Sequence, residues 1–318
     1  MISNIKVIRY EPEQKPAWDE FVSRSRNGTF LFYRDYMDYH AERFPDCSLM
    51  FFDEGEKLLA MMPATAQGET LSSHAGLTFG GIVSDAQMKT PLMLEVFDVL
   101  QAHLRAEGIK RLLYKVVPHI YHLIPAEEDL YALYRHNAKL VRRDISSTID
   151  LKEKLPFSKG RKYEIKQAAK HGLEVKQSHD FRSFMAIEEQ VLGVKYDSKP
   201  VHSAAEMHLL AARFPENIKL FAAFRDEEML AGVIIYESLT VAHAQYIAAG
   251  DEGKRTGALD LILGYLINDY YSCKKYFDFG ISTENQGRQL NVGLIENKQS
   301  FGARAIVHDF YELEVDND

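Results

Sequence analysis

The chain has 318 residues, of which 46 % are hydrophobic and 26 % charged, so it is long enough for two domains that each have a core. A formal net charge of −8 argues against a protein whose main partner is nucleic acid. Neither Cys47 nor Cys273 lies in a Cys/His cluster with zinc spacing. No run of about 18 apolar residues is present, and the first residues lack the pattern of a signal peptide. These features predict a cytoplasmic protein without a metal site or a membrane span.

The first half of the chain has the pattern of an α/β unit. Two apolar runs flank an acidic, glycine-containing turn, which predicts a β-hairpin. Later apolar residues recur every 3.6 positions, as on one face of a helix. In chain order we expect a hairpin over 49–63, a strand over 70–73, a glycine-rich segment over 76–81, a helix over 92–104 and a strand over 109–117.

The second half repeats this order of elements. We expect a hairpin over 218–236, a strand over 241–249, a glycine-rich loop over 250–257, a helix over 259–270 and a strand over 275–281. The repeated order indicates an internal duplication, although alternating elements are also common in α/β proteins in general. Pro156 interrupts regular structure between the halves. The predicted fold class is therefore α/β with mixed sheets, in two tandem units over 1–152 and 153–318.

A basic helix is expected over 159–171, directly after the join. Its lysines recur every three or four positions and share one face, and Gly172 is placed to end it. This face could be an ordinary solvated surface or could face an anionic ligand. Two more helices precede the second hairpin, one through Phe181 and Phe184 and one with a capping box that begins at Ser203. A strand over 305–315 ends the chain.

Three segments in this order resemble the GNAT acyltransferases, and in particular the FemAB-like branch that fuses two such units. They are the basic helix with the strand that follows it (161–175), the run Tyr276-Phe277-Asp278-Phe279-Gly280, and the run Lys298-Gln299-Ser300-Phe301-Gly302-Ala303. The triplet Asp278-Phe279-Gly280 also occurs in protein kinases, but the other elements of kinase chemistry are missing in the required order. By recognisable motif the resemblance covers about 157 to 303.

The resemblance implies an N-acyltransferase that moves an acyl group from acetyl-CoA or another acyl-CoA to a small-molecule or peptide-like amine. The segment before the helix near Ala258 would hold the diphosphate of the donor, because helix N-termini bind anions. The family's phosphate loop is only partly matched. Candidate donor-binding residues are Gly253, Arg255, Thr256 and Gly257.

The catalytic candidates lie on the two strands beside that segment. On the strand 241–249, simple alternation puts His243 and Gln245 on one face and Tyr246 on the other. His243 is a candidate base, although a single histidine in a strand is more often structural. Asp278 and Glu284 are further candidate bases at the end of the closing strand, with surface solvation the more ordinary role for Glu284. Our catalytic set is Asp278, His243 and Tyr246.

Candidate acceptor-binding residues are spread over both halves. Lys298 occupies the position where many GNAT enzymes have a general-acid tyrosine, so it could bind an acceptor anion or form a structural ion pair. Tyr33 lies in an aromatic stretch that faces the acceptor in FemAB-like proteins, and Lys115 ends a buried strand, where a lysine needs a partner. The set is Tyr33, Lys115, Arg161, Lys166, Asn285, Asn291 and Lys298.

Two other functions remain open from the sequence. The FemAB-like resemblance also implies an aminoacyl transferase that uses aminoacyl-tRNA and a peptidoglycan precursor, although the net charge of −8 counts against tRNA. The incomplete phosphate loop is also consistent with a non-catalytic protein that binds a small ligand. Apart from tRNA in the first alternative, we expect no nucleic-acid partner, and the sequence does not indicate an oligomeric state.

Overall fold

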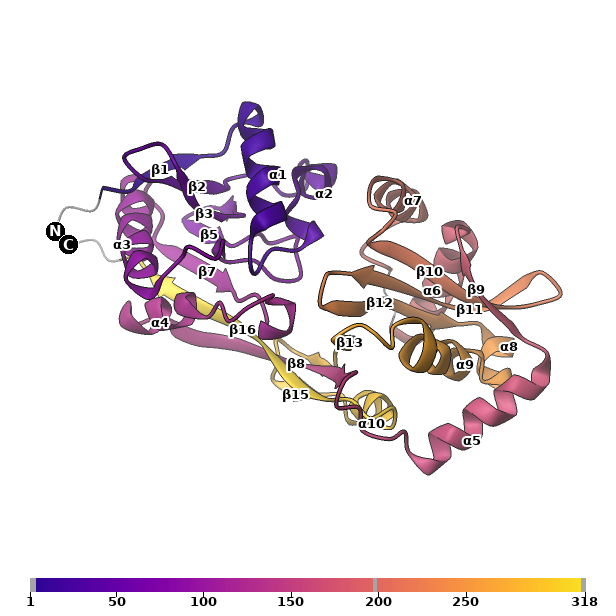
Figure 1. Ribbon diagram of the computed structural model, residues 1–318. Coiled ribbons are helices and arrows are strands. Elements are labelled where there is room, and N and C mark those ends of the chain that lie inside the picture. The colour runs from indigo at the N-terminus through magenta and orange to yellow at the C-terminus, as the bar shows by residue number, and fades with distance from the viewer. Residues whose placement is uncertain (1–3, 197–198, 316–318) are drawn as a thin grey trace. The chain divides into compact units, whose positions relative to one another are not determined.

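The computed structural model describes residues 4–196 and 199–315, without the side chains of 194–196, and the chain forms two compact units (Figure 1). Unit 1 contains the residues up to Asp144, with Asn285–Gln289 and the residues from Val307 onward. Unit 2 contains Ile145–Glu284 and Leu290–Ile306. These bounds differ from those of the duplicated units 1–152 and 153–318, which stay a prediction about the origin of the two halves.

Unit 1 has one four-stranded sheet in the order β1-β2-β3-β6 and a second set of strands in the order β4-β5-β7-β16, in which β16 is Arg304–Glu314. The expected hairpin is confirmed as the antiparallel pair β2 and β3. The elements are β1 (Lys6–Arg9), α1 (Lys15–Arg24), α2 (Arg34–Met37), β2 (Leu49–Phe52), β3 (Leu58–Met62), β4 (Thr65–Gln67), β5 (Thr70–Ser72), β6 (Val83–Ser84), α3 (Thr90–Ala106), β7 (Arg111–Lys115) and α4 (Glu128–Arg135). Helix α3 buries the expected apolar stripe against this unit's core.

Unit 2 has strands in the order β8-β13-β12-β11-β10-β9. The second hairpin is confirmed as β10 and β11. The elements are α5 (Lys159–Ala168), β9 (Glu174–Ser178), α6 (Phe181–Tyr196), α7 (Ala204–Arg213), β10 (Ile218–Arg225), β11 (Glu228–Glu237), β12 (Val241–Ala249), α8 (Asp251–Thr256), α9 (Ala258–Tyr265), β13 (Tyr276–Ile281), β14 (Thr283–Glu284), β15 (Gln289–Leu290) and α10 (Val292–Gln299). The capping box at Ser203 is confirmed at the start of α7.

Both units contain a parallel pair of strands joined by a helical crossover. In unit 1, β5 pairs with β7 after the crossover α3, and in unit 2, β12 pairs with β13 after α8 and α9. The strand beside each pair comes from the other half of the sequence. Residues 146–150 of β8 (Lys139–Asp150) pair with β13, and residues 310–314 of β16 (Arg304–Glu314) pair with β7.

One prediction about unit 2 is wrong. The expected glycine-rich loop over 250–257 is mostly helix, because α8 occupies Asp251–Thr256 and ends at Gly257, which has a left-handed backbone (φ 69°). Gly253 lies inside α8, and a Cβ there would be 2.2 Å from the carbonyl oxygen of Leu230. The glycine therefore lets α8 pack directly on β11, and its place in the sequence does not require a loop.

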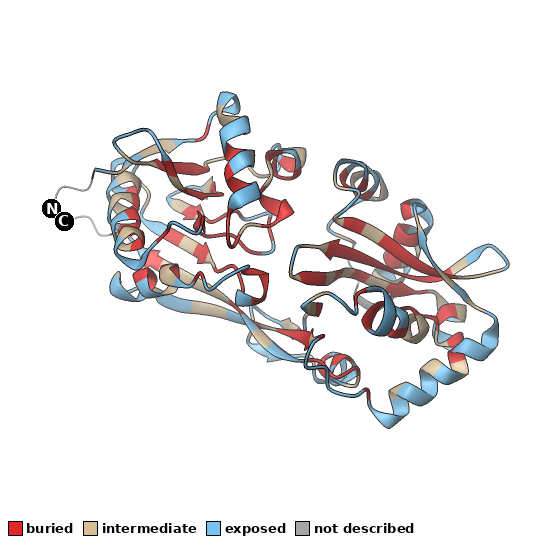
Figure 2. Ribbon diagram, viewed as in Figure 1, coloured by how far each residue is buried: buried red, intermediate tan, exposed pale blue. Residues whose placement is uncertain are grey.

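Helices cover both faces of the unit 2 sheet. Helix α9 packs on the face that carries Val233, Ile235 and Phe277, where the main core of this unit lies. Helices α6 and α7 pack on the other face, and Figure 2 shows how deeply β11 and β12 are buried between these layers. Within the described residues, no helix is long and apolar enough to cross a membrane.

Candidate active site

The imidazole of His243 and the carboxylate of Asp278 form a hydrogen-bonded pair in unit 2. The parallel strands β12 and β13 place the two residues directly opposite each other. His243 Nδ1 lies 2.7 Å from Asp278 Oδ2. The Asp278 side chain is fully buried, whereas the His243 side chain is 13 % exposed, so the histidine is the member of the pair that solvent or a substrate can reach.

Further donors surround the Asp278 carboxylate. Ser146 Oγ and Thr148 Oγ1, both on β8, donate to Oδ1 over 2.6 and 2.7 Å. The backbone N–H of Gly280 donates to Oδ2 over 3.3 Å. Hydrogen bonds of this kind favour the ionised form of a buried carboxylate. An ionised Asp278 can accept a hydrogen bond from Nδ1–H of His243, and Nε2 is then the ring nitrogen that can accept a proton.

A β-bulge brings Tyr246 to the same face of the sheet as this pair. Tyr236 pairs with His243, but Ile234 pairs with Tyr246, so Gln245 is an extra residue between them. The expectation from simple alternation, which put His243 and Tyr246 on opposite faces, is therefore wrong. The Tyr246 hydroxyl lies 2.6 Å from Nδ1 of the buried His202.

Strands β12 and β13 stop pairing at the candidate site. The last recorded pair is His243 with Asp278, although β12 continues to Ala249 and stays paired with β11. Within the described residues, 244–249 have no ladder partner on β13, so the backbone N–H groups on that side of β12 are not used for pairing with β13. Such preorganised N–H groups can stabilise the oxyanion that forms during acyl transfer.

Lys298 holds the turn that follows β13. Its side chain donates to the carbonyl oxygens of Gly280 and Ile281, each over 2.8 Å, and the residue is only 5 % exposed. Burial lowers the pKa of Lys298 to about 8, and the nearby Asp278 partly opposes this shift. These contacts favour a structural role for Lys298 over a direct contact with an acceptor.

The donor-binding prediction gains little support from the geometry of α8 and α9. The first turn of α8 contains Asp251 and Glu252, which would repel a phosphate. Arg255 is exposed and pairs with Glu252, while the first turn of α9 carries Asp260. The Thr256 hydroxyl donates to the Glu252 carbonyl over 2.8 Å, and Gly257 caps α8.

The acceptor candidates of unit 2 have mainly internal contacts. Arg161 forms an ion pair with Asp260 and lies over the ring of Phe301, with 4.2 Å between its Cζ and the ring centroid. Lys166 lies on the outer face of α5, which Figure 2 shows to be largely exposed, as expected for a solvated helix face. Asn291 caps α10 and donates to Glu284 over 3.0 Å.

The remaining acceptor candidates lie in unit 1. Tyr33 is partly exposed at the start of α2, and burial raises the pKa of its hydroxyl. Lys115 donates to the carbonyl oxygens of His74, Ala75 and Leu77 over 3.1, 3.1 and 2.7 Å. Burial lowers the pKa of Lys115 to about 8. Asn285 has a left-handed backbone and donates to Gln289.

Sequence reasoning missed Glu188 on α6. It follows Phe181 and Phe184 on the stripe that packs against the sheet, and it is 7 % exposed. Phe184 lies against Gly232, on the same face as the His243–Asp278 pair. Burial raises the pKa of the Glu188 carboxyl to about 7. A carboxylate within an apolar helical stripe was the signal that could have identified it.

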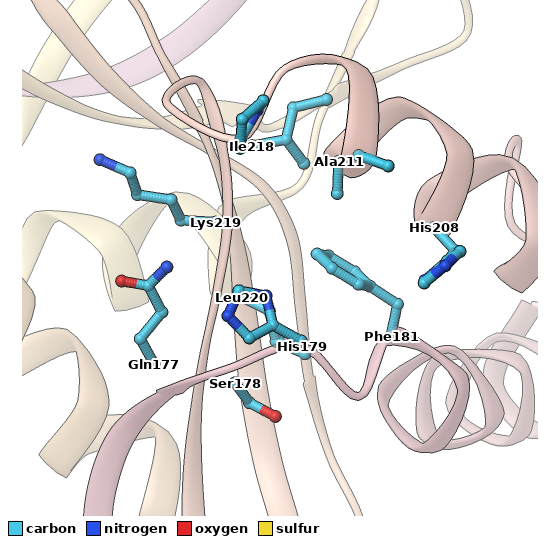
Figure 3. A pocket seen from close by; sticks show the side chains of 11 residues that line it. Gln177, Ser178, His179, Phe181, His208, Ala211, Ile218, Lys219 and Leu220 are labelled. Atoms are coloured by element: carbon cyan, nitrogen blue, oxygen red, sulfur yellow. The ribbon is translucent and has the colours of Figure 1, made fainter.

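A small pocket of about 280 Å³ lies where β9 and β10 meet α6 and α7 (Figure 3). Phe181, Ala211 and Ile218 give it apolar walls, and His179 and His208 contribute imidazoles. Figure 3 shows Lys219 extending away from Phe181 and His208. The pocket contains none of the residues that the sequence singled out for catalysis.

Comparisons with known proteins identify the type of fold. Residues 158–286 match a family model described as an acetyltransferase (GNAT) domain. No curated protein matches the chain in sequence. The structure of FemX is similar with a TM-score of 0.68 at 9 % identity, over 97 % of each chain.

Two further solved structures have the same fold. The C-terminal domain of a putative lysylphosphatidylglycerol synthetase from Agrobacterium fabrum aligns with a TM-score of 0.59 and 11 % identity, over 95 % of this chain and 92 % of that one. A tandem GNAT protein from the clavulanic acid biosynthesis pathway aligns with a TM-score of 0.50 and 10 % identity, over 99 % of each chain.

Proposed function

We propose that this protein transfers an acyl group from an activated donor to an amine, because residues 158–286 match the model of a GNAT acetyltransferase domain and the chain shares its fold with FemX and with a tandem GNAT protein. The observation that carries the proposal is the His243–Asp278 pair at the point where β12 and β13 separate. It puts a polarised imidazole beside an open strand edge that can receive a thioester or ester carbonyl.

In the proposed reaction, the amine has already lost the extra proton of its ammonium form to solvent, and Nε2 of His243 accepts one proton from the amine nitrogen as that nitrogen attacks. Asp278 holds the ring in place and stabilises the imidazolium that forms. The amine attacks the acyl carbonyl, and N–H groups of β12 stabilise the oxyanion. The tetrahedral intermediate then collapses to an amide and the leaving group, which can take its proton from His243.

The donor that we propose first is an acyl-CoA, as in most GNAT enzymes. The carboxylates in the first turn of α8 disfavour a diphosphate at that helix, so an aminoacyl ester is the second candidate. The fold shared with FemX supports this second donor only through the FemAB-like resemblance. Acetyl-CoA, longer acyl-CoAs and aminoacyl-tRNA must therefore each be assayed separately as donors.

The test measures acyl transfer with each donor and a panel of amines and amino acids, over pH 5 to 9. For the productive pair, His243→Gln should lower kcat by about 100-fold or more with little change in KM. Asp278→Asn should lower kcat by a similar factor, because it no longer fixes the tautomer of His243.

His208→Gln is the matched control, since this exposed histidine lies in the same unit but outside the site. Equal rates and pH profiles for His243→Gln and the unchanged protein would remove the catalytic assignment. Absence of binding to every donor would leave the non-catalytic alternative in its place.

A further inference from the structure

A second cavity, of about 540 Å³, lies in unit 2 on the face of β10 that is opposite to the pocket of Figure 3. It is formed by the ends of β10, β11 and β13 and by the turn that follows the π-helical segment Leu266–Tyr270. Its volume falls in the usual range for small-molecule sites. It contains neither member of the His243–Asp278 pair.

Lysines dominate the charge of this cavity. Lys152, Lys219, Lys274 and Lys275 line it against a single acidic residue, Glu237, which gives a formal charge of +3 in a chain of net charge −8. The lysines come from distant parts of the sequence. Pairing of Asp150 with Tyr276 brings the segment with Lys152 beside the Lys274-Lys275 doublet.

Glu237 holds the inner two lysines in place. Its carboxylate accepts from Lys219 over 2.9 Å, from Lys274 over 2.7 Å and from the Tyr271 hydroxyl over 3.1 Å. Burial, the largest single effect, raises the pKa of Glu237, but the hydrogen bonds and charges of Lys274 and Lys219 together lower it below its ordinary value. The carboxylate can neutralise only one of the two ammonium groups, so the inner cluster keeps a positive charge.

The outer two lysines are available for a ligand. Lys152 and Lys275 are exposed, and among the described residues neither side chain has an ion pair. Thr240 also lines the cavity, and its hydroxyl oxygen is buried beneath this surface without a hydrogen-bond partner in the described part of the chain. A buried hydroxyl is normally hydrogen-bonded, so an occupant that accepts from Thr240 would satisfy it.

Apolar surface lies beside these charges. Leu239 is 77 % exposed and Tyr270 is 41 % exposed, and both border the cavity. We propose that this cavity binds a small organic phosphate with two or more negative charges, whose phosphates contact the lysines and Thr240 and whose organic part covers Leu239 and Tyr270. Lysine is suited to this task because its ammonium is a compact point charge that binds phosphate in many orientations.

Cys273 supplies a direct readout of occupancy, because this exposed thiol lines the cavity. The rate of its alkylation by neutral iodoacetamide can be followed by peptide mass spectrometry, with Cys47 in unit 1 as the internal reference. Inorganic pyrophosphate at low salt should slow alkylation of Cys273 about fivefold or more and half-protect it below about 1 mM, while Cys47 is unaffected. Acetate at the same ionic strength should give no protection.

Variants distinguish specific binding in this cavity from a general attraction of anions to positive charge on the protein. Lys152→Ala/Lys275→Ala should raise the half-protecting concentration about tenfold or more. Lys162→Ala/Lys170→Ala removes the same charge from exposed positions in α5 and in the 3-10 segment Ala169–His171 that follows it, and should leave the half-protecting concentration unchanged. Thr240→Val keeps the volume and should weaken protection about threefold or more. Equal protection by acetate, or equal effects of the two lysine pairs, would overturn the proposal, and neither outcome depends on acyl transfer.

Discussion

Thr148 Oγ1 and Asp278 Oδ1 lie 2.7 Å apart, although 130 positions separate the two residues in the sequence. The contact exists because residues 146–150 of β8 pair with β13. This hydrogen bond connects the buried carboxylate of the candidate site to β8, a strand on which sequence analysis placed no functional residue.

Thr148→Val should weaken the site without changing its shape. Loss of one donor to a buried carboxylate should lower the free energy of unfolding by about 1 kcal/mol and, under the proposed function, lower kcat several-fold while KM stays nearly constant. Urea unfolding and steady-state kinetics measure the two effects. Ser147→Ala is the control on the same strand, because the Ser147 hydroxyl is buried and has no hydrogen-bond partner among the described residues. Equal effects of the two substitutions would contradict the positioning role of Thr148.

Gly253→Ala should destabilise unit 2 strongly. The new Cβ would be 2.2 Å from the carbonyl oxygen of Leu230, so α8 must move away from β11. We expect a loss of about 2 kcal/mol or more by chemical unfolding. Gly160→Ala in α5 is the matched control, since among the described residues a Cβ there meets no atom within 4 Å apart from its chain neighbours and the backbone of its own helix, and it should raise stability by about 0.5 kcal/mol or more. If Gly253→Ala left the free energy of unfolding unchanged, α8 would not pack on β11 as described.

Glu188→Gln should raise stability in a pH-dependent way. The folded protein raises the pKa of this carboxyl from 4.5 to about 7, so between these values the folded state holds a proton that the unfolded chain has released. Stability therefore falls as the pH rises through this window. The variant should match the unchanged protein near pH 4.5 and exceed it by up to about 3 kcal/mol at pH 8, the free energy of a shift from pKa 4.5 to about 7. Glu189→Gln, at an exposed neighbour, should show no such divergence.

Tyr114→Phe should destabilise unit 1. The buried Tyr114 hydroxyl donates to Asp129 over 2.7 Å and accepts from the backbone N–H of Ile82 over 2.7 Å. Removal of the hydroxyl leaves the Asp129 carboxyl and the Ile82 N–H without this partner, which should lower the free energy of unfolding by about 2 kcal/mol. Burial raises the pKa of Asp129 to about 6, and the hydrogen bond from Tyr114 opposes this rise because it favours the ionised carboxylate. Without that bond the ionised form is less stable in the folded protein, so the loss of stability should be larger at pH 8 than at pH 5.

Tyr134→Phe changes a hydroxyl that is 76 % exposed on the same unit and should be neutral. The comparison requires thermal or urea unfolding of both variants at each pH. Equal losses for Tyr114→Phe at the two pH values would contradict the coupling of Tyr114 to Asp129.

Local patterns were sufficient to identify most elements of the fold. The apolar runs around short turns correctly predicted the hairpins β2–β3 and β10–β11, and helical periodicity predicted α3 and α9. Helix α8 was missed, because glycines suit both a loop and close helix packing. Helix α10 and the long strand β8 were not predicted, since α10 has no apolar stripe and β8 follows no clear alternation.

The sequence by itself determined the two α/β halves, the resemblance to the GNAT acyltransferases and the choice of His243 and Asp278 as candidates. Only the tertiary structure decided that these two side chains form a pair, because their contact depends on the parallel register of β12 and β13. Likewise, the bulge at Gln245 decided the face of Tyr246, and strand pairing gathered Lys152 with Lys274 and Lys275. Register and pairing between distant segments depend on the free energy of the whole packed sheet, which no local stretch of sequence contains.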